Sequence, residues 1–229
     1  MKFYDSLIEE LNSCIDGFDS QSYDYSETLL WHEDDHQTVI LSRDTAYELN
    51  GCGFNLVTSM PVCDGVTVIG EDLLSISSDR RFSRVSIIQL DETDDEQTAH
   101  NLIKKIEYTK YHFFPTGYMM RTASTSHSEK VRVSLSAIKN GINFSSLGNL
   151  FIKKYKENKS VKAVRIIFIT NDKIDYSKLN DIAKSAGEIT KALDHVMSSV
   201  NFDCDTCKLK AVCDEVEGLR ELHFKDKMN

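Results

Sequence analysis

The apolar stretch VKAVRIIFIT at 161–170 constrains the fold more than any other part of the chain. It does not alternate apolar and polar residues, so it predicts a strand that is covered on both faces. At 177–197 apolar residues recur every three or four positions and predict a long helix with one buried stripe. A chain of 229 residues that is 41% hydrophobic has enough apolar material for such a core.

The first half of the chain is rich in predicted strands. Apolar spacings of three and four predict a helix at 3–16, and the polar residues 18–36 indicate an irregular segment. Asp64-Gly65 predicts a hairpin turn, and Gly51-Cys52-Gly53 predicts a tight turn that leaves Cys52 exposed. Short apolar runs bounded by turn residues predict strands at 38–41, 46–49, 54–59, 66–69 and 85–90.

The second half mixes the two kinds of element, and the whole pattern favours an α+β (mixed α/β) fold. It has a β-rich N-terminal half, a strand–helix C-terminal half and a short Cys-rich C-terminal appendage. The predicted divisions are an N-terminal helix with an irregular segment (1–36), a main domain (37–198) and a Cys-rich metal-binding or cluster-binding tail (199–229). The further predicted elements are a helix at 95–109, a loop or ligand-contacting surface at 111–130, a strand at 131–135 and a helix at 145–157.

The excess of acidic residues restricts the partners. The chain has 36 acidic and 27 basic residues, a formal charge of −9. Such a charge disfavours binding to nucleic-acid phosphates or to an anionic membrane surface, so neither partner is expected. No apolar run approaches the roughly 20 residues of a transmembrane helix, and the acidic N-terminal sequence is unlike a signal peptide. A cytoplasmic protein is therefore expected.

Three of the six cysteines lie close together, in the segment FDCDTCKLKAVCD at 202–214. Their spacing is Cys204-x2-Cys207-x5-Cys213, and thiolates grouped in this way select zinc or an iron–sulfur cluster. Either site takes about four ligands, so a fourth is needed from elsewhere in the chain, from an exogenous group or from a partner. The alternative is three packed cysteines with no metal. The candidates for the fourth ligand within the chain are Cys52, Cys63 and His223.

The segment at 46–73, AYELNGCGFNLVTSMPVCDGVTVIGEDL, resembles the start of a domain of the acetyl-CoA synthase / carbon monoxide dehydrogenase β subunit family. The similarity continues through Thr116-Gly117, the VRVS run at 131–134 and the FIT run at 168–170 into the cysteine motif. It covers about residues 37–213, so 37–198 resembles the middle domain of that family. The residues of the first segment that carry it are Glu48, Gly51, Phe54, Leu56, Val57, Asp64, Gly65, Val68, Ile69, Gly70 and Asp72.

The resemblance implies a [4Fe–4S] cluster rather than zinc, because the corresponding family cysteines hold such a cluster bridged to two nickel ions. The family's Cys-Gly-Cys, which holds the distal nickel, has no counterpart here, so no complete nickel site and no acetyl-CoA synthesis by this chain alone are expected. The implied role is docking, accessory function or electron transfer in anaerobic one-carbon metabolism. The implied partners are acetyl-CoA synthase/CO dehydrogenase, a corrinoid protein or a ferredoxin-like protein.

Two other functions stay open: a structural zinc domain, and an enzyme subunit for acyl or methyl transfer that interacts with coenzyme A or a corrinoid and is completed by a partner. The family's Trp-His-Thr-Gly element, which is associated with coenzyme A, corresponds to the FPTG run at 114–117. No catalytic residue is assigned. The resemblance implies a coenzyme A-like contact at Phe114, Thr116, Gly117 and Arg121.

Three further patterns carry weaker predictions. The HEDDH run at 32–36 has the histidine spacing of a zinc protease but is interpreted as a solvated acidic loop. The Ser-rich run at 122–128 has no visible general base. The basic stretch at 153–159 is interpreted as a solvated helix end, with binding of phosphates or an acidic partner as the alternative. The same alternative applies to Arg80, Arg81, Arg84 and Arg121.

Overall fold

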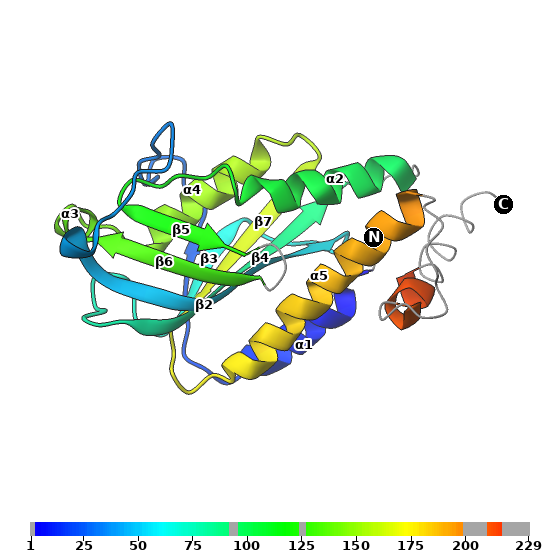
Figure 1. The fold of residues 1–229 in the computed structure, drawn as a ribbon, viewed down its shortest axis with the longest axis horizontal. Coiled ribbons are helices and arrows are strands. Elements are labelled where there is room, and N and C mark those ends of the chain that lie inside the picture. Colours follow the sequence, from blue (N-terminus) through cyan, green and yellow to red (C-terminus); the bar gives the residue numbers. More distant parts are fainter. Residues whose placement is uncertain (1–2, 92–95, 124–126, 199–209, 217–229) are drawn as a thin grey trace.

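The computed structural model describes residues 3–91, 96–123, 127–198 and 210–216 (Figure 1). Its elements are α1 (Asp5–Ile15), β1 (Gln21–Asp24), the 3-10 turn η1 (Ser42–Asp44), β2 (Thr45–Thr58), β3 (Gly65–Ile69), β4 (Arg80–Leu90), α2 (Glu96–Thr109), β5 (Tyr118–Thr122), β6 (Ser128–Ser134), α3 (Leu135–Lys139), α4 (Phe144–Lys156), β7 (Val161–Ile169) and α5 (Tyr176–Ser198). A further helical turn spans 210–216. The expected α+β class is confirmed.

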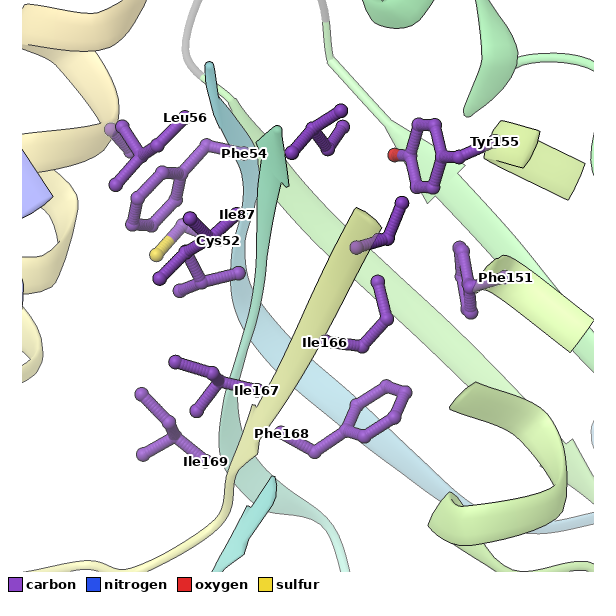
Figure 2. Packing of buried hydrophobic residues seen from close by; sticks show 14 of the residues in the cluster. Cys52, Phe54, Leu56, Ile87, Phe151, Tyr155, Ile166, Ile167, Phe168 and Ile169 are labelled. Carbon is purple, nitrogen blue, oxygen red and sulfur yellow. The ribbon is translucent and has the colours of Figure 1, made fainter. Parts of the chain in front are cut away.

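The strands form one mixed sheet in the order β1-β3-β7-β4-β2-β6-β5. The β3–β7 and β4–β2 pairs are parallel, and the other neighbours are antiparallel. Helix α4 packs on β3 and β7, with α2 beside it, whereas α5 packs on β2 and β4 of the other face together with α1 (Figures 1 and 2). The result is three layers, with the sheet in the middle. Within the described residues, no helix combines the length and the apolar character that crossing a membrane requires.

Strand β7 is the centre of the core, and the prediction that it is covered on both faces is confirmed. Ile166 and Phe168 point toward α4, while Ile167 and Ile169 point toward the opposite helices (Figure 2). All four side chains are at most 3% exposed. The ring of Phe168 stacks on Phe144 of α4, with 4.3 Å between their centroids. The predicted helices at 3–16, 95–109, 145–157 and 177–197 are likewise present as α1, α2, α4 and α5.

The first predicted turn in the β-rich half is wrong. Residues 46–59 were expected as two strands around a tight turn at Gly51-Cys52-Gly53, but β2 runs unbroken through them. The two glycines instead let neighbouring groups come close to the backbone of β2. A Cβ on Gly51 would lie 1.6 Å from the carbonyl oxygen of Phe82, and one on Gly53 would lie 2.0 Å from Oε2 of Glu129. Cys52 consequently points into the core and is 1% exposed.

The other expected turn, a hairpin at Asp64-Gly65, is also wrong, because β3 pairs with β1 and β7 and not with β2. The Asp64 carboxylate instead accepts hydrogen bonds from Lys156 and from the backbone N–H of Val164. It thereby ties the start of β3 to the end of α4 and to β7. This long-range role leaves no mark on the local sequence.

The region expected as a loop at 111–130 contains β5 and the beginning of β6, which pair with each other. The expected strand at 38–41 is irregular and covers the outer edge of β5 instead. Gln37 donates from Nε2 to the Met120 carbonyl at 2.7 Å, and the Ile40 N–H lies 3.4 Å from the Met119 sulfur. These contacts occupy an edge that would otherwise be open to pairing with another chain. Residues 18–36, expected to be irregular, include the edge strand β1.

The beginning of α4 depends on a side-chain cap. The Asn143 Oδ1 accepts a hydrogen bond from the Ser146 N–H at 2.8 Å. We expect Asn143→Ala to lower the free energy of unfolding by about 1 kcal/mol, because one N–H of the first turn loses its partner. Urea unfolding followed by circular dichroism measures this change. Ser145→Ala is the control, because Ser145 is the second residue of α4 and lies two positions after the cap. Equal unfolding midpoints for the two variants would contradict the prediction.

Candidate functional site

The structure describes one of the three clustered cysteines. Cys204, Cys207 and the fourth-ligand candidate His223 lie outside the described residues. Cys213 lies on the helical turn 210–216, where it is half-buried against the core, and Val216 of the same turn is only 2% exposed. In Figure 1 this turn lies at the same end of the molecule as the carboxyl end of α5. The part of the cysteine segment that is described is therefore attached to the body of the protein.

The two remaining fourth-ligand candidates differ in their surroundings. Cys52 lies in the middle of β2, with its sulfur 3.2 Å from the Ser83 hydroxyl, and burial raises the pKa of its thiol to about 11. Cys63 is exposed in the connection between β2 and β3. A metal ligand is a thiolate, so Cys63 is chemically the better donor. Among the described residues, no three His, Cys, Asp or Glu side chains form a group that would hold a metal ion.

The four residues implied as a coenzyme A-like contact lie in and just before β5. Thr116 and Gly117 are fixed by neighbours: the Thr116 hydroxyl donates to Asp34 at 2.7 Å, and the Trp31 indole donates to the Thr116 carbonyl at 2.8 Å. Gly117 has a φ of +72°, and a Cβ there would lie 2.6 Å from the Ala137 Cβ. Phe114 is half-buried beside them, while Arg121 is exposed four residues further along.

The HEDDH segment is not helical, and four of its five residues are exposed, as expected. Its place in the fold was not expected. Glu33 forms an isolated β-bridge with Pro115, and the His32 carbonyl accepts a hydrogen bond from the Thr116 N–H at 2.9 Å. Two motifs that are remote in the sequence thus form one surface element. Their acceptor and donor groups already bind each other, which leaves fewer of them for a ligand.

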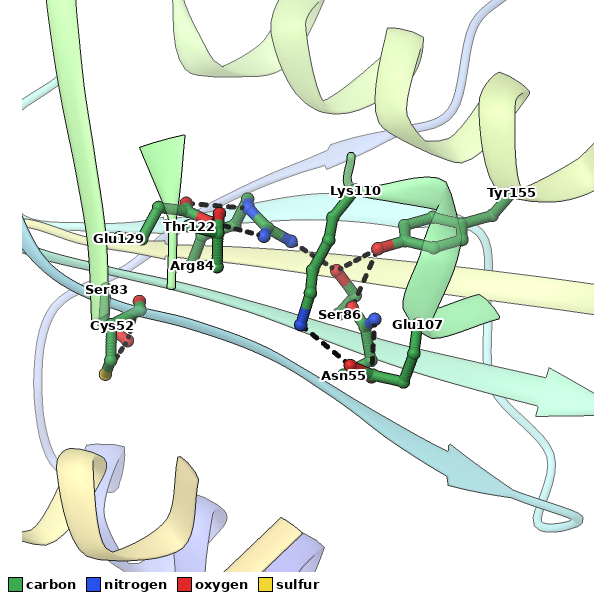
Figure 3. Close-up of polar contacts among 10 residues, drawn as sticks. All are labelled: Cys52, Asn55, Ser83, Arg84, Ser86, Glu107, Lys110, Thr122, Glu129 and Tyr155. Carbon is green, nitrogen blue, oxygen red and sulfur yellow. Dashed lines mark hydrogen bonds and ion pairs between the residues drawn. The ribbon is translucent and has the colours of Figure 1, made fainter. Parts of the chain in front are cut away.

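A buried polar cluster in the described core was not predicted from the sequence. Arg84 of β4 and Glu129 of β6 have no exposed side-chain surface and form a two-pronged ion pair, with N–O distances of 3.0 and 2.6 Å (Figure 3). Arg84 also donates to Ser86 at 3.0 Å, and its guanidinium lies 4.7 Å from the centre of the Phe151 ring. The alternative in which Arg84 binds phosphates or an acidic partner is therefore wrong for this residue, since its side chain is not exposed. Thr122 of β5 completes the carboxylate's shell at 3.0 Å.

The cluster continues toward α2 through a chain of hydrogen bonds. Tyr155 donates to Asn55 at 2.8 Å, Asn55 donates to Glu107 at 2.9 Å, and Lys110 donates to the same carboxylate at 2.8 Å (Figure 3). Burial lowers the pKa of Arg84, but the adjacent Glu129 carboxylate outweighs that effect and the net shift is upward. Arg84 and Glu129 are sealed from solvent, so the cluster joins four strands and two helices instead of receiving a substrate.

An accessible feature lies on the same side of the sheet. A cleft of about 790 Å³ lies between the second half of α2 and the end of α4. Four of its lining residues are lysines, two of them from each side. The sequence indicated the α4 half of this surface through the basic stretch at 153–159, but not the α2 half.

No protein-family model matches the chain. A search of curated proteins also returned no match.

Proposed function

We propose that this protein is an iron–sulfur protein of the acetyl-CoA synthase β-subunit type that lacks the dinickel site. In this proposal Cys204, Cys207 and Cys213 bind a [4Fe–4S] cluster, and the protein acts in the cytoplasm as a docking, accessory or electron-transfer partner of another protein. One observation carries the proposal: the Cys204-x2-Cys207-x5-Cys213 spacing, which puts three thiolates within reach of one cluster.

The surroundings of Cys213 support this proposal. Its helical turn is fixed to the core by Val216, so a ligand at Cys213 is attached to the body of the protein. The connection that holds Cys63 follows β2, whose end lies beside the beginning of α1: Thr58 donates to Asp5 at 2.8 Å. Tyr4, just before α1, is hydrogen-bonded to Thr190 in the second half of α5 at 3.0 Å. The strand that leads to Cys63 therefore ends near α1, which contacts the second half of α5.

The ligand count supports a role with a partner. A cluster takes about four ligands, and the motif supplies three, so the fourth vertex is open to Cys63, to His223 or to a residue of a second protein. A cluster completed at an interface gives docking and electron transfer a common site. Cys52 is the least suitable fourth ligand, because its buried thiol would have to ionise and leave Ser83.

Metal analysis of protein purified without oxygen tests the proposal. We expect about four irons and four sulfides per chain, with a broad visible absorption that bleaches on reduction. Cys204→Ala is expected to lose the iron and the absorption because it removes one of three motif thiolates. Cys14→Ser is the matched control, since Cys14 lies on α1 outside the motif and the variant should keep the cluster.

Two results would contradict the proposal. Stoichiometric zinc without sulfide would place the protein among structural zinc domains, and the absence of any metal would remove the cluster altogether.

When the cluster is present, the variants Cys63→Ser and Cys52→Ala locate its fourth ligand. A cluster that survives in Cys52→Ala but loses stability in Cys63→Ser is the expected pattern.

A further inference from the structure

The cleft between α2 and α4 has an unusual local charge. Lys104 and Lys105 come from α2, Lys154 from α4, and Lys159 from the turn that follows α4. Among the described residues of the lining, Glu157 is the only acidic one. The chain as a whole carries a formal charge of −9. A concentration of cations in an acidic protein raises the local potential for an anion, and a concave shape strengthens that effect.

The lysines fall into two kinds. Lys104 is paired with Asp194 at 2.6 Å, and Lys154 lies 3.5 Å from Glu33 and 3.6 Å from Glu157. Lys105 and Lys159 form no ion pair within the part of the chain that the structure describes. Complementing the dipole of α4 explains Lys154, but it does not explain two lysines on the neighbouring helix. Among the described lining residues, Lys105 and Lys159 are therefore the lysines whose charge has no ion-pair partner.

The cleft also has an aromatic wall. Tyr108 is 65% exposed, and its ring is nearly parallel to that of His112, with 6.2 Å between their centroids and 14° between their planes. An exposed flat surface of this kind is a platform on which a nucleobase stacks. The amide nitrogen Nδ2 of Asn158, also in the lining, is buried and has no hydrogen-bond partner among the described residues.

We propose that this cleft binds a nucleoside di- or triphosphate. Lys105 and Lys159 contact the phosphates, and the base stacks on Tyr108 and His112. The cleft of about 790 Å³ falls within the range of small-molecule sites, which is roughly 300–1,000 Å³. A mononucleotide fits the charge balance better than a nucleic acid, because a long polyanion would also meet the acidic remainder of the surface. This site is independent of the cysteine motif.

Calorimetric titration of the full chain tests the site with three probes: ATP, inorganic triphosphate and adenosine. We expect ATP to bind more tightly than triphosphate or adenosine, because only ATP contacts both the lysines and the aromatic wall. Lys105→Ala/Lys159→Ala is expected to weaken ATP binding by about tenfold or more, and Tyr108→Ala to abolish the preference for ATP over triphosphate. Both lysines and Tyr108 are exposed, so these variants should fold normally.

The control is Lys173→Ala/Lys178→Ala, which removes two exposed lysines near the start of α5 and should leave ATP binding unchanged. A Kd for ATP weaker than about 1 mM would overturn the proposal, as would equal losses in the two double variants. Equal affinity for ATP and triphosphate would overturn the role of the aromatic wall. Cys204→Ala should bind ATP as the parent chain does, which separates this test from that of the cluster.

Discussion

Glu129→Ala is expected to lower the free energy of unfolding by about 3–5 kcal/mol, because it leaves a buried guanidinium without its counter-ion. Arg84 has no exposed side-chain surface and donates two hydrogen bonds to this one carboxylate. The Thr122 hydroxyl loses its acceptor as well. Urea unfolding monitored by circular dichroism measures the loss.

The matched control for this variant is Glu48→Ala, on the neighbouring strand β2. Glu48 pairs with Arg132 at 2.6 Å, but both side chains are about one-third exposed, so the loss should be about 0–1 kcal/mol. The double replacement Arg84→Met/Glu129→Leu removes both charges together and should be less destabilising than Glu129→Ala. Equal losses for Glu129→Ala and Glu48→Ala would show that burial of the ion pair does not matter.

Gly51→Ala is expected to destabilise the protein by about 3 kcal/mol or more, and to do so through the backbone. The new Cβ would lie 1.6 Å from the carbonyl oxygen of Phe82 and 2.8 Å from its carbonyl carbon, both on the paired strand β4. A backbone group in the middle of a sheet cannot rotate away as the end of a side chain does. The β2–β4 pairing must therefore separate locally.

Asn50→Ala controls for a change at the adjacent position of β2. Asn50 is half-buried, and a substitution there should alter stability by no more than about 0.5 kcal/mol. Hydrogen exchange adds a local measurement: amides of β2 and β4 should exchange faster in Gly51→Ala than in Asn50→Ala. Identical unfolding midpoints in the two variants would mean that the strands accommodate a methyl group at Gly51.

The two discussed sites differ in how much of them the sequence predicts. The cysteine motif is entirely a matter of local spacing, so it was found from the sequence, although two of its three cysteines lie outside the described residues. One side of the cleft was indicated by the sequence, because the basic residues at 153–159 are neighbours in the chain. Its other wall comes from α2, and only packing places Lys104 and Lys105 opposite Lys154 and Lys159.

The sequence by itself determined the elements whose signal repeats along the chain. The strand at 161–170 and the helix at 177–197 were predicted correctly, because their apolar residues follow the periods of a doubly covered strand and an amphipathic helix. The α+β class follows from such elements. These signals are local, since each depends only on residues within the same segment.

Tertiary structure alone decided the pairing of remote segments. Arg84 and Glu129 are 45 residues apart in the chain, and each by itself has the character of a surface residue. The glycines of β2 predict a turn when only the sequence is considered. In the structure, Phe82 and Glu129 occupy the space that side chains at Gly51 and Gly53 would need. A charge in a strand and a glycine in a strand take their meaning from the atoms packed against them, and those atoms come from other parts of the chain.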